Sequence, residues 1–137
     1  MSTPALVEGV ELARFVLFGS PRTKKNHSRV IRLKGKGGTR ILPSEAHERW
    51  FGMAMPQARL IAARLRAPIC EPVAVEALFY RDRVLGDLVG YLQALGDLLE
   101  AACIIENDRL IASWDGSRLL KDAVQPRIEV VISEVAG

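Results

Sequence analysis

Apolar residues gather in short runs along this chain, and Gly, Pro or charged residues separate the runs. Runs of this length, with alternating or continuous apolar positions, are typical of β-strands. The alternation is clearest where Val73, Val75, Ala77 and Phe79 fall on one face. The pattern predicts strands over 13–19, 73–80, 109–115 and 127–135, with a further short strand at 39–42.

Two longer segments, 45–66 and 88–102, carry apolar residues at helical spacing instead. Ser44 and Asp87 stand where an N-cap is expected for each helix. Pro56 lies inside the first segment, so we expect that helix to be kinked or divided. The order β-(β)-α-β-α-β-β predicts an α/β or α+β fold in which two main helices pack on a mixed β-sheet. We expect one domain over residues 1–137.

Composition predicts where the protein is located in the cell and whether three of its side chains are buried or exposed. The sequence has no apolar run long enough for a transmembrane helix, and its first residues lack the pattern of a secretory signal. We therefore expect a cytoplasmic protein without a membrane partner. Cys70 and Cys103 are expected to be buried thiols, and His47 is expected to be solvated.

Charge is distributed unevenly along the chain. Residues 1–40 hold nine Lys or Arg and two acidic residues, a net charge of +7, whereas the remainder has a net charge of −4. The segment 20–40 is basic and Gly-rich, which predicts an exposed loop or loose hairpin. Such a segment favours a polyanionic partner, although a solvated loop without a partner is equally compatible. The candidate DNA contacts are Lys24, Lys25, Asn26, Arg29 and Arg32.

Three aspartates are the candidates for chemistry. Asp87 precedes the second helix, Asp97 lies on it, and Asp108 lies in the turn before the next strand. Gln93 and Asp97 share the polar face of that helix with Gly90. Carboxylates suit Mg²⁺, which activates water and neutralises phosphate charge in phosphodiester cleavage. Taken singly, each aspartate is more often a cap or a solvated residue.

The spacing of these residues resembles the RusA family of Holliday-junction resolvases. The family motif Asp-x-Asp-Asn-x-x-Lys-x-x-x-Asp-x-Leu begins at Asp87 and reaches Asp97 and Leu99. The turn IENDRLI (105–111) matches its second motif through Asp108, and FVLFGSPRTKKN (15–26) is similar to its opening strand and basic segment. The resemblance implies a homodimeric Mg²⁺-dependent endonuclease that nicks four-way DNA junctions symmetrically, with Mn²⁺ as a second possible metal. It also implies that Asp87 and Asp108 are metal ligands.

The sequence departs from the family motif at three positions. Val89 replaces the second Asp, Gly90 the Asn, and Gln93 the Lys. Either the site is rebuilt, with Asp97 or Glu106 replacing the missing ligand, or the protein binds junction DNA with weak or no cleavage. A third hypothesis is an unrelated small protein whose basic loop binds RNA or a protein.

The segment after the expected strand 109–115 holds further candidates. Trp114 is expected in the core or at a dimer interface, although the cluster it starts could be functional. Asp115 could reach the acidic cleft and Arg118 a phosphate. No Walker A motif and no GxGxxG occurs in the sequence, so we expect no nucleotide cofactor.

Overall fold

A computed structural model describes residues 9–24, 29–32, 39–42, 44–66 and 68–135 of the chain. The elements in chain order are β1 (Glu11–Phe18), β2 (Arg29–Arg32), β3 (Thr39–Leu42), α1 (Glu45–Leu65), β4 (Val73–Arg81), α2 (Leu88–Ala101), a short 3-10 helix η1 (Asp108–Leu110), β5 (Ile111–Ser113), β6 (Arg118–Lys121) and β7 (Arg127–Glu134). This is the mixed α+β class that the sequence predicts, with two main helices.

The main sheet has five strands in the order β1-β7-β4-β5, with β6 also paired to β4. β7 lies between β1 and β4 and is antiparallel to both. β5 and β6 both pair parallel with the remaining edge of β4, at its beginning and at its end. They therefore share one strand position, which the turn 114–117 interrupts. The expected strand 109–115 is correspondingly shorter, and β6 was not predicted.

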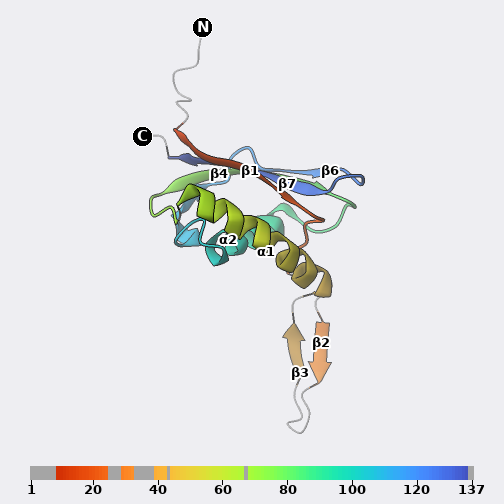
Figure 1. The fold of residues 1–137 in the computed structure, drawn as a ribbon. Coiled ribbons are helices and arrows are strands. Elements are labelled where there is room, and N and C mark those ends of the chain that lie inside the picture. The colour runs from red at the N-terminus through yellow and green to blue at the C-terminus, as the bar shows by residue number, and fades with distance from the viewer. Residues whose placement is uncertain (1–8, 25–28, 33–38, 43, 67, 136–137) are drawn as a thin grey trace.

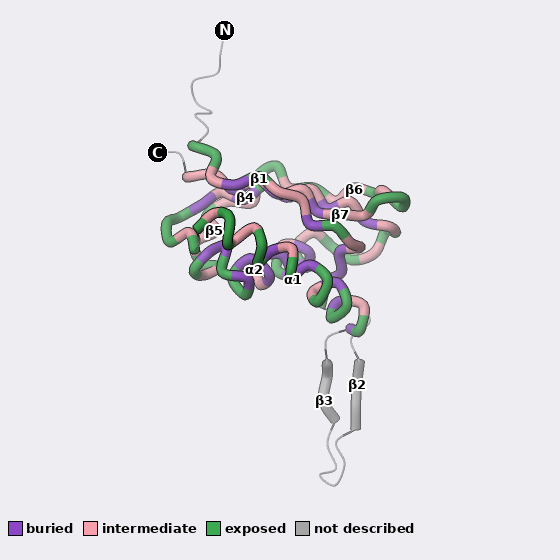
Figure 2. The backbone as a smooth tube through the Cα atoms, in the orientation of Figure 1, coloured by how far each residue is buried: buried purple, intermediate pink, exposed green. Residues whose placement is uncertain are grey.

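Both helices cover the same face of the sheet (Figure 1). The inward side chains of β4 alternate as predicted, because Val73, Val75, Ala77 and Phe79 are buried. They form one core with the apolar side of α2, which contributes Leu95, Leu98 and Leu99 among others. Figure 2 shows this buried layer between the sheet and the helices. One shared core agrees with a single domain.

Of the two effects expected of Pro56, division of the helix does not occur, because α1 runs unbroken through this residue. Proline removes one N–H and leaves the carbonyl group of Gly52 without its helical donor. Both residues are exposed, so water can satisfy that carbonyl group. The next residue, Gln57, ties the helix to the sheet: its amide accepts from the Phe18 backbone N–H at 2.8 Å and donates to the Phe18 carbonyl oxygen at 2.9 Å.

The basic segment contains an antiparallel pair, β2 and β3, as the expected loose hairpin and the short strand at 39–42 require. These strands form a separate two-stranded sheet. Figure 1 shows it standing away from the main sheet, beyond the beginning of α1. β2 and β3 thus lie apart from the core (Figure 1), whereas Arg22 and Thr23 of the same segment are buried.

Three expectations about side-chain environment are wrong. His47 is buried, because α1 turns it under the chain at Arg22 and against Trp50 and Phe51. Cys70 and Cys103 are exposed free thiols, since both lie in connections outside the core.

Among the described residues, no helix is long and apolar enough to span a membrane.

Candidate functional site

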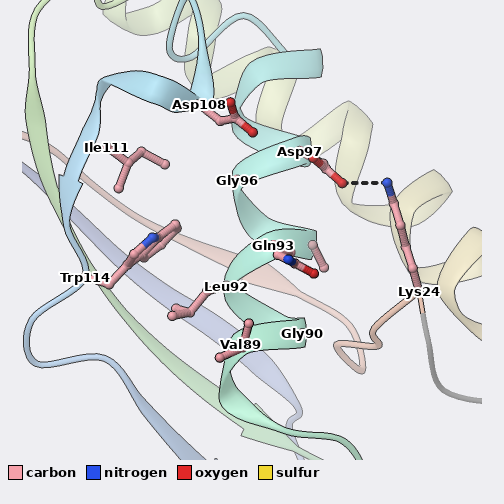
Figure 3. Close-up of a pocket in the computed structure, with 11 residues that line it drawn as sticks. Lys24, Val89, Gly90, Leu92, Gln93, Gly96, Asp97, Asp108, Ile111 and Trp114 are labelled. Carbon is pink, nitrogen blue, oxygen red and sulfur yellow. Dashed lines mark ion pairs between the residues drawn. The ribbon is translucent and has the colours of Figure 1, made fainter.

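A cleft of about 610 Å³ lies along the exposed side of α2. The helix forms its floor, the chain at Lys24 lies on one side, and η1 with β5 lies on the other (Figure 3). Its lining residues are Lys24, Val89, Gly90, Leu92, Gln93, Ala94, Gly96, Asp97, Asp108, Ile111 and Trp114. Gln93, Asp97 and Asp108 were all candidates from the sequence, and the fold brings them to this one surface.

The turn after α2 carries Asp108 back to the helix. Cys103 adopts a left-handed backbone conformation (φ +62°), and the N–H groups of Ile104 and Ile105 both donate to the Leu99 carbonyl oxygen. The Glu100 side chain then accepts from the Asp108 backbone N–H at 2.9 Å. A Cβ atom on Gly96 would lie 3.8 Å from the Cβ atom of Asp108. Asp108 is therefore held beside the helix turn that carries Asp97.

Lys24 brings a cation to the same cleft. Its Nζ lies 2.6 Å from Asp97 Oδ2, and the two side chains are 52% and 37% exposed. The family motif places its lysine at the position of Gln93, on the helix itself. Here an ammonium group reaches this cleft from the segment before β2 instead. The sequence departure at Gln93 does not leave the cleft without positive charge.

Buried contacts hold the chain just before Lys24. The Arg22 guanidinium donates to both carboxylate oxygens of Asp82, at 2.7 and 3.0 Å, and His47 Nδ1 donates to the Arg22 carbonyl oxygen at 3.2 Å. Hydrogen bonds from Arg22 keep the pKa of Asp82 below its ordinary value, and burial lowers the pKa of His47. Thr23, also buried, packs over Gly90. We call Arg22, Asp82, His47, Thr23 and Gly90 the clamp.

Asp87 has a different surrounding from the other two aspartates. As predicted, it caps α2, because its Oδ1 accepts from the Gly90 backbone N–H at 2.9 Å. Gly90 and Gly96 are separated by about 9 Å along the helix axis, at 1.5 Å per residue. Asp87 is thus near the beginning of the helix, while Asp108 lies beside Gly96. The structure does not bring Asp87 and Asp108 together.

The acidic side chains of the cleft can be compared with what Mg²⁺ requires. No group of three His, Cys, Asp or Glu side chains within the described ranges is arranged to hold a metal ion. Mg²⁺ commonly binds one or two carboxylates and completes its shell with water and substrate phosphate. Asp97 and Asp108, which line one cleft from two elements, fit a site of that kind.

Two other candidates, Asp115 and Arg118, lie away from the cleft. Asp115 is exposed and lines a different hollow, with Glu11, Arg14 and Glu76. It therefore does not join the acidic cleft. Arg118 of β6 pairs with Leu78 of β4. The residues on either side of Leu78, Ala77 and Phe79, are buried under the helices, so the side chains of Leu78 and Arg118 lie on the opposite face of the sheet, away from α2.

Glu106, the possible substitute ligand, is exposed beside Asn107 and Arg109 rather than in the cleft. Asn107, which stands at the first acid of the second motif, caps η1 by accepting from the Arg109 backbone N–H. Lys25 and Asn26 lie outside the described residues. Arg29 and Arg32 belong to β2, and their side chains also lie outside the described part.

Sequence reasoning missed the clamp. In the sequence, Arg22 is one more cation in a basic run, and nothing local distinguishes it from its solvated neighbours. Its acidic partner is 60 positions away, which no local pattern reveals.

Neither the models of known protein families nor the curated proteins compared with this chain give a match. The similarity to the RusA family therefore rests on the order and spacing of the motifs alone.

Proposed function

We propose that this protein is a metal-dependent endonuclease that resolves branched DNA, in particular four-way junctions, by symmetric nicking. One observation carries the proposal: Asp97 and Asp108, from two different elements, face one cleft that also contains Lys24. Two carboxylates can bind a metal ion that activates water, and a nearby cation can neutralise phosphate charge, which together suit metal-assisted phosphodiester hydrolysis.

The division of work within the cleft follows from the chemistry of each group. Asp97 and Asp108 would hold Mg²⁺, or Mn²⁺, which when bound supplies an acidified water and neutralises phosphate charge. Lys24 can turn its ammonium group from Asp97 to a phosphate oxygen. A pair as exposed as this one contributes only about 0–1 kcal/mol, so exchanging it for a phosphate contact is not costly. Gln93 can donate a hydrogen bond to the same phosphate.

DNA affinity is expected to come mainly from the basic segment, with Lys24, Lys25, Arg29 and Arg32 as phosphate contacts. Such contacts lose affinity steeply as salt rises. We further propose that the protein acts as a homodimer, because a four-way junction has the two-fold symmetry that suits one. A role on DNA without a membrane partner or nucleotide cofactor is consistent with a cytoplasmic location.

The test is cleavage of a synthetic four-way junction with Mg²⁺ and with a chelator. Asp97→Asn and Asp108→Asn should abolish nicking while junction binding persists. Asp115→Asn is the matched control, because it removes an exposed carboxylate outside the cleft. Equal cleavage by the wild type and both cleft variants would refute this site.

Asp87→Asn separates the motif from the geometry. Asparagine caps a helix about as well as aspartate, so stability should be kept. If Asp87 only caps α2, this variant cleaves like the wild type. Loss of cleavage at full stability would instead favour the ligand role that the family resemblance implies.

A second candidate function is junction binding without cleavage. Two observations favour this function: Val89 and Gln93 replace two motif residues, and the carboxylate of Asp97 forms an ion pair with Lys24 instead of being open to a metal ion. It predicts salt-sensitive junction binding and no product with Mg²⁺ or Mn²⁺. Equal affinity for junction, duplex and single-stranded RNA would count against both functions.

A further inference from the structure

One side of the cleft has no part in the phosphate chemistry described above. It is apolar and is formed by Val89, Leu92, Ile111 and Trp114. In Figure 3, Trp114 lies on the side of α2 opposite Lys24, together with Ile111 and Leu92. Val89 places an apolar side chain that is 61% exposed at the position where the family motif has a carboxylate. The cleft is therefore amphipathic, with an aromatic side and a charged side.

Trp114 stands on a firmly held turn. The Ser117 backbone N–H donates to the Trp114 carbonyl oxygen at 3.0 Å, and the Ser117 hydroxyl accepts from the Ala77 backbone N–H of β4 at 3.0 Å. Gly116 adopts φ +87°, and a Cβ atom there would collide with the Glu76 side chain. The hydrogen bonds of Ser117 fasten the turn to β4, and packing against the core holds the indole in place.

We propose that this cleft binds an unpaired stretch of DNA that lies across α2, with a base against Trp114 and a phosphate beside Lys24. The inference rests on the proposed function, because it takes DNA as the ligand. An aromatic side chain beside a cation is the usual arrangement for holding a single strand, since each base offers a face and each linkage a charge. In a duplex the base faces are already stacked, so Trp114 would favour unpaired bases over paired ones.

The dimensions of the cleft agree with this ligand. Its volume of about 610 Å³ lies within the range of about 300–1,000 Å³ for small-molecule sites. Thr23 and Asp87 lie against Gly90, and Asp108, Trp114 and Ile111 lie near Gly96, so a strand in the cleft would meet these side chains rather than the backbone of α2. Trp114 packs against the core, as expected from the sequence, and because it is only partly buried its remaining surface lines the cleft.

Tryptophan fluorescence can test the contact directly. The chain has two tryptophans. Trp50 is 3% exposed, and its Nε1 has no hydrogen-bond partner within the described residues. Trp50→Phe therefore loses no hydrogen bond and leaves Trp114 as the sole reporter. Single-stranded oligothymidylate should quench this protein, whereas an abasic strand of equal length and charge should bind without quenching. Equal quenching by both strands would overturn the proposal.

Affinity measurements with Trp114→Leu and Trp114→Phe complete the test. Leucine keeps apolar packing and removes the aromatic face, so single-strand affinity should fall by about 5- to 150-fold, the effect of losing one base stack. Phenylalanine should restore most of it, and duplex affinity should stay unchanged in both variants. Unchanged single-strand affinity of Trp114→Leu, with junction cleavage intact, would refute only this inference. Failure of the wild type to bind any DNA would refute the proposed function as well.

Discussion

Replacing Gly90 with alanine probes how the basic segment is seated on α2. An added Cβ atom would lie 2.9 Å from Asp87 Oδ1, 3.0 Å from Thr23 Cγ2 and 3.2 Å from Thr23 Cβ. Thr23 is buried, and Asp87 is engaged in capping the helix, so neither can move away freely. The substitution should push the chain before Lys24 away from the helix.

The magnitude follows from two opposing effects. Alanine is favoured over glycine inside a helix by about 1 kcal/mol. Overpacking a tight site costs about 1–3 kcal/mol. Gly52→Ala on α1 is the matched control, because no atom lies within 4 Å of its added Cβ. Gly90 lies in the first turn of α2, where alanine gains less than it does at Gly52 in the interior of α1. Gly90→Ala should therefore be at least about 1–3 kcal/mol less stable than Gly52→Ala.

Urea denaturation followed by circular dichroism measures this difference. With a slope of about 1–3 kcal/mol per molar urea, the two midpoints should differ by roughly 1 M. Gly96→Ala adds a second control, because its nearest contacts would be ordinary ones at 3.8 Å. If Gly90→Ala gained as much stability as Gly52→Ala, the packing of Thr23 against α2 would be refuted. DNA affinity should fall in Gly90→Ala, since Lys24 follows Thr23 directly.

Three further predictions concern the clamp and the helix start. The destabilising effects of Arg22→Ala and Asp82→Ala should be non-additive, with a coupling of about 0.5–3 kcal/mol in a double-mutant cycle of unfolding free energies. Because the folded-state pKa of Asp82 is lowered, the stabilisation by this carboxylate is complete above pH about 4 and is lost as pH falls. Asp82→Asn should remove this part of the pH dependence. Because burial lowers the pKa of His47, protonation favours unfolding, and the free energy of unfolding should decline as pH falls below about 6.5. The decline should be weaker in His47→Gln. The same pH profile of stability in this variant and in the wild type would contradict the burial of the ring. Ser44→Ala removes the acceptor for the His47 backbone N–H and should cost about 1 kcal/mol, as thermal unfolding would show. Because Ser44 is buried, the control is Ser44→Thr, which keeps an uncharged acceptor and should cost less.

The parts of the fold that were predicted correctly depend on neighbours in the sequence. Helix starts at Ser44 and Asp87 follow from capping, which involves residues two or three positions apart. The inward face of β4 follows from alternation. Errors arose where tertiary packing dominates: His47 has an ordinary surface sequence, and its burial depends on the chain at Arg22 folding over it.

The candidate site divides in the same way. Spacing along the chain placed Asp97 on the polar face of α2 and Asp108 in the turn that follows, and both line the cleft. Spacing also suggested Asp87 as the partner of Asp108, whereas the helix rise holds these two apart. Arg118 and Asp115 looked close in sequence to the acidic segment, but the strand register turns them to other surfaces.

The sequence by itself determined the two main helices and their N-caps, most of the strands, the sheet face that is buried and the basic character of the segment before α1. These depend on local periodicity, local hydrogen bonding and charge, which a single chain displays openly. Only the tertiary structure decided that Lys24 meets Asp97, that Arg22 meets Asp82 and that Trp114 stands beside the same cleft. Contacts between residues so far apart in the chain depend on how the helices pack on the sheet, and no repeat or spacing in the sequence records that packing.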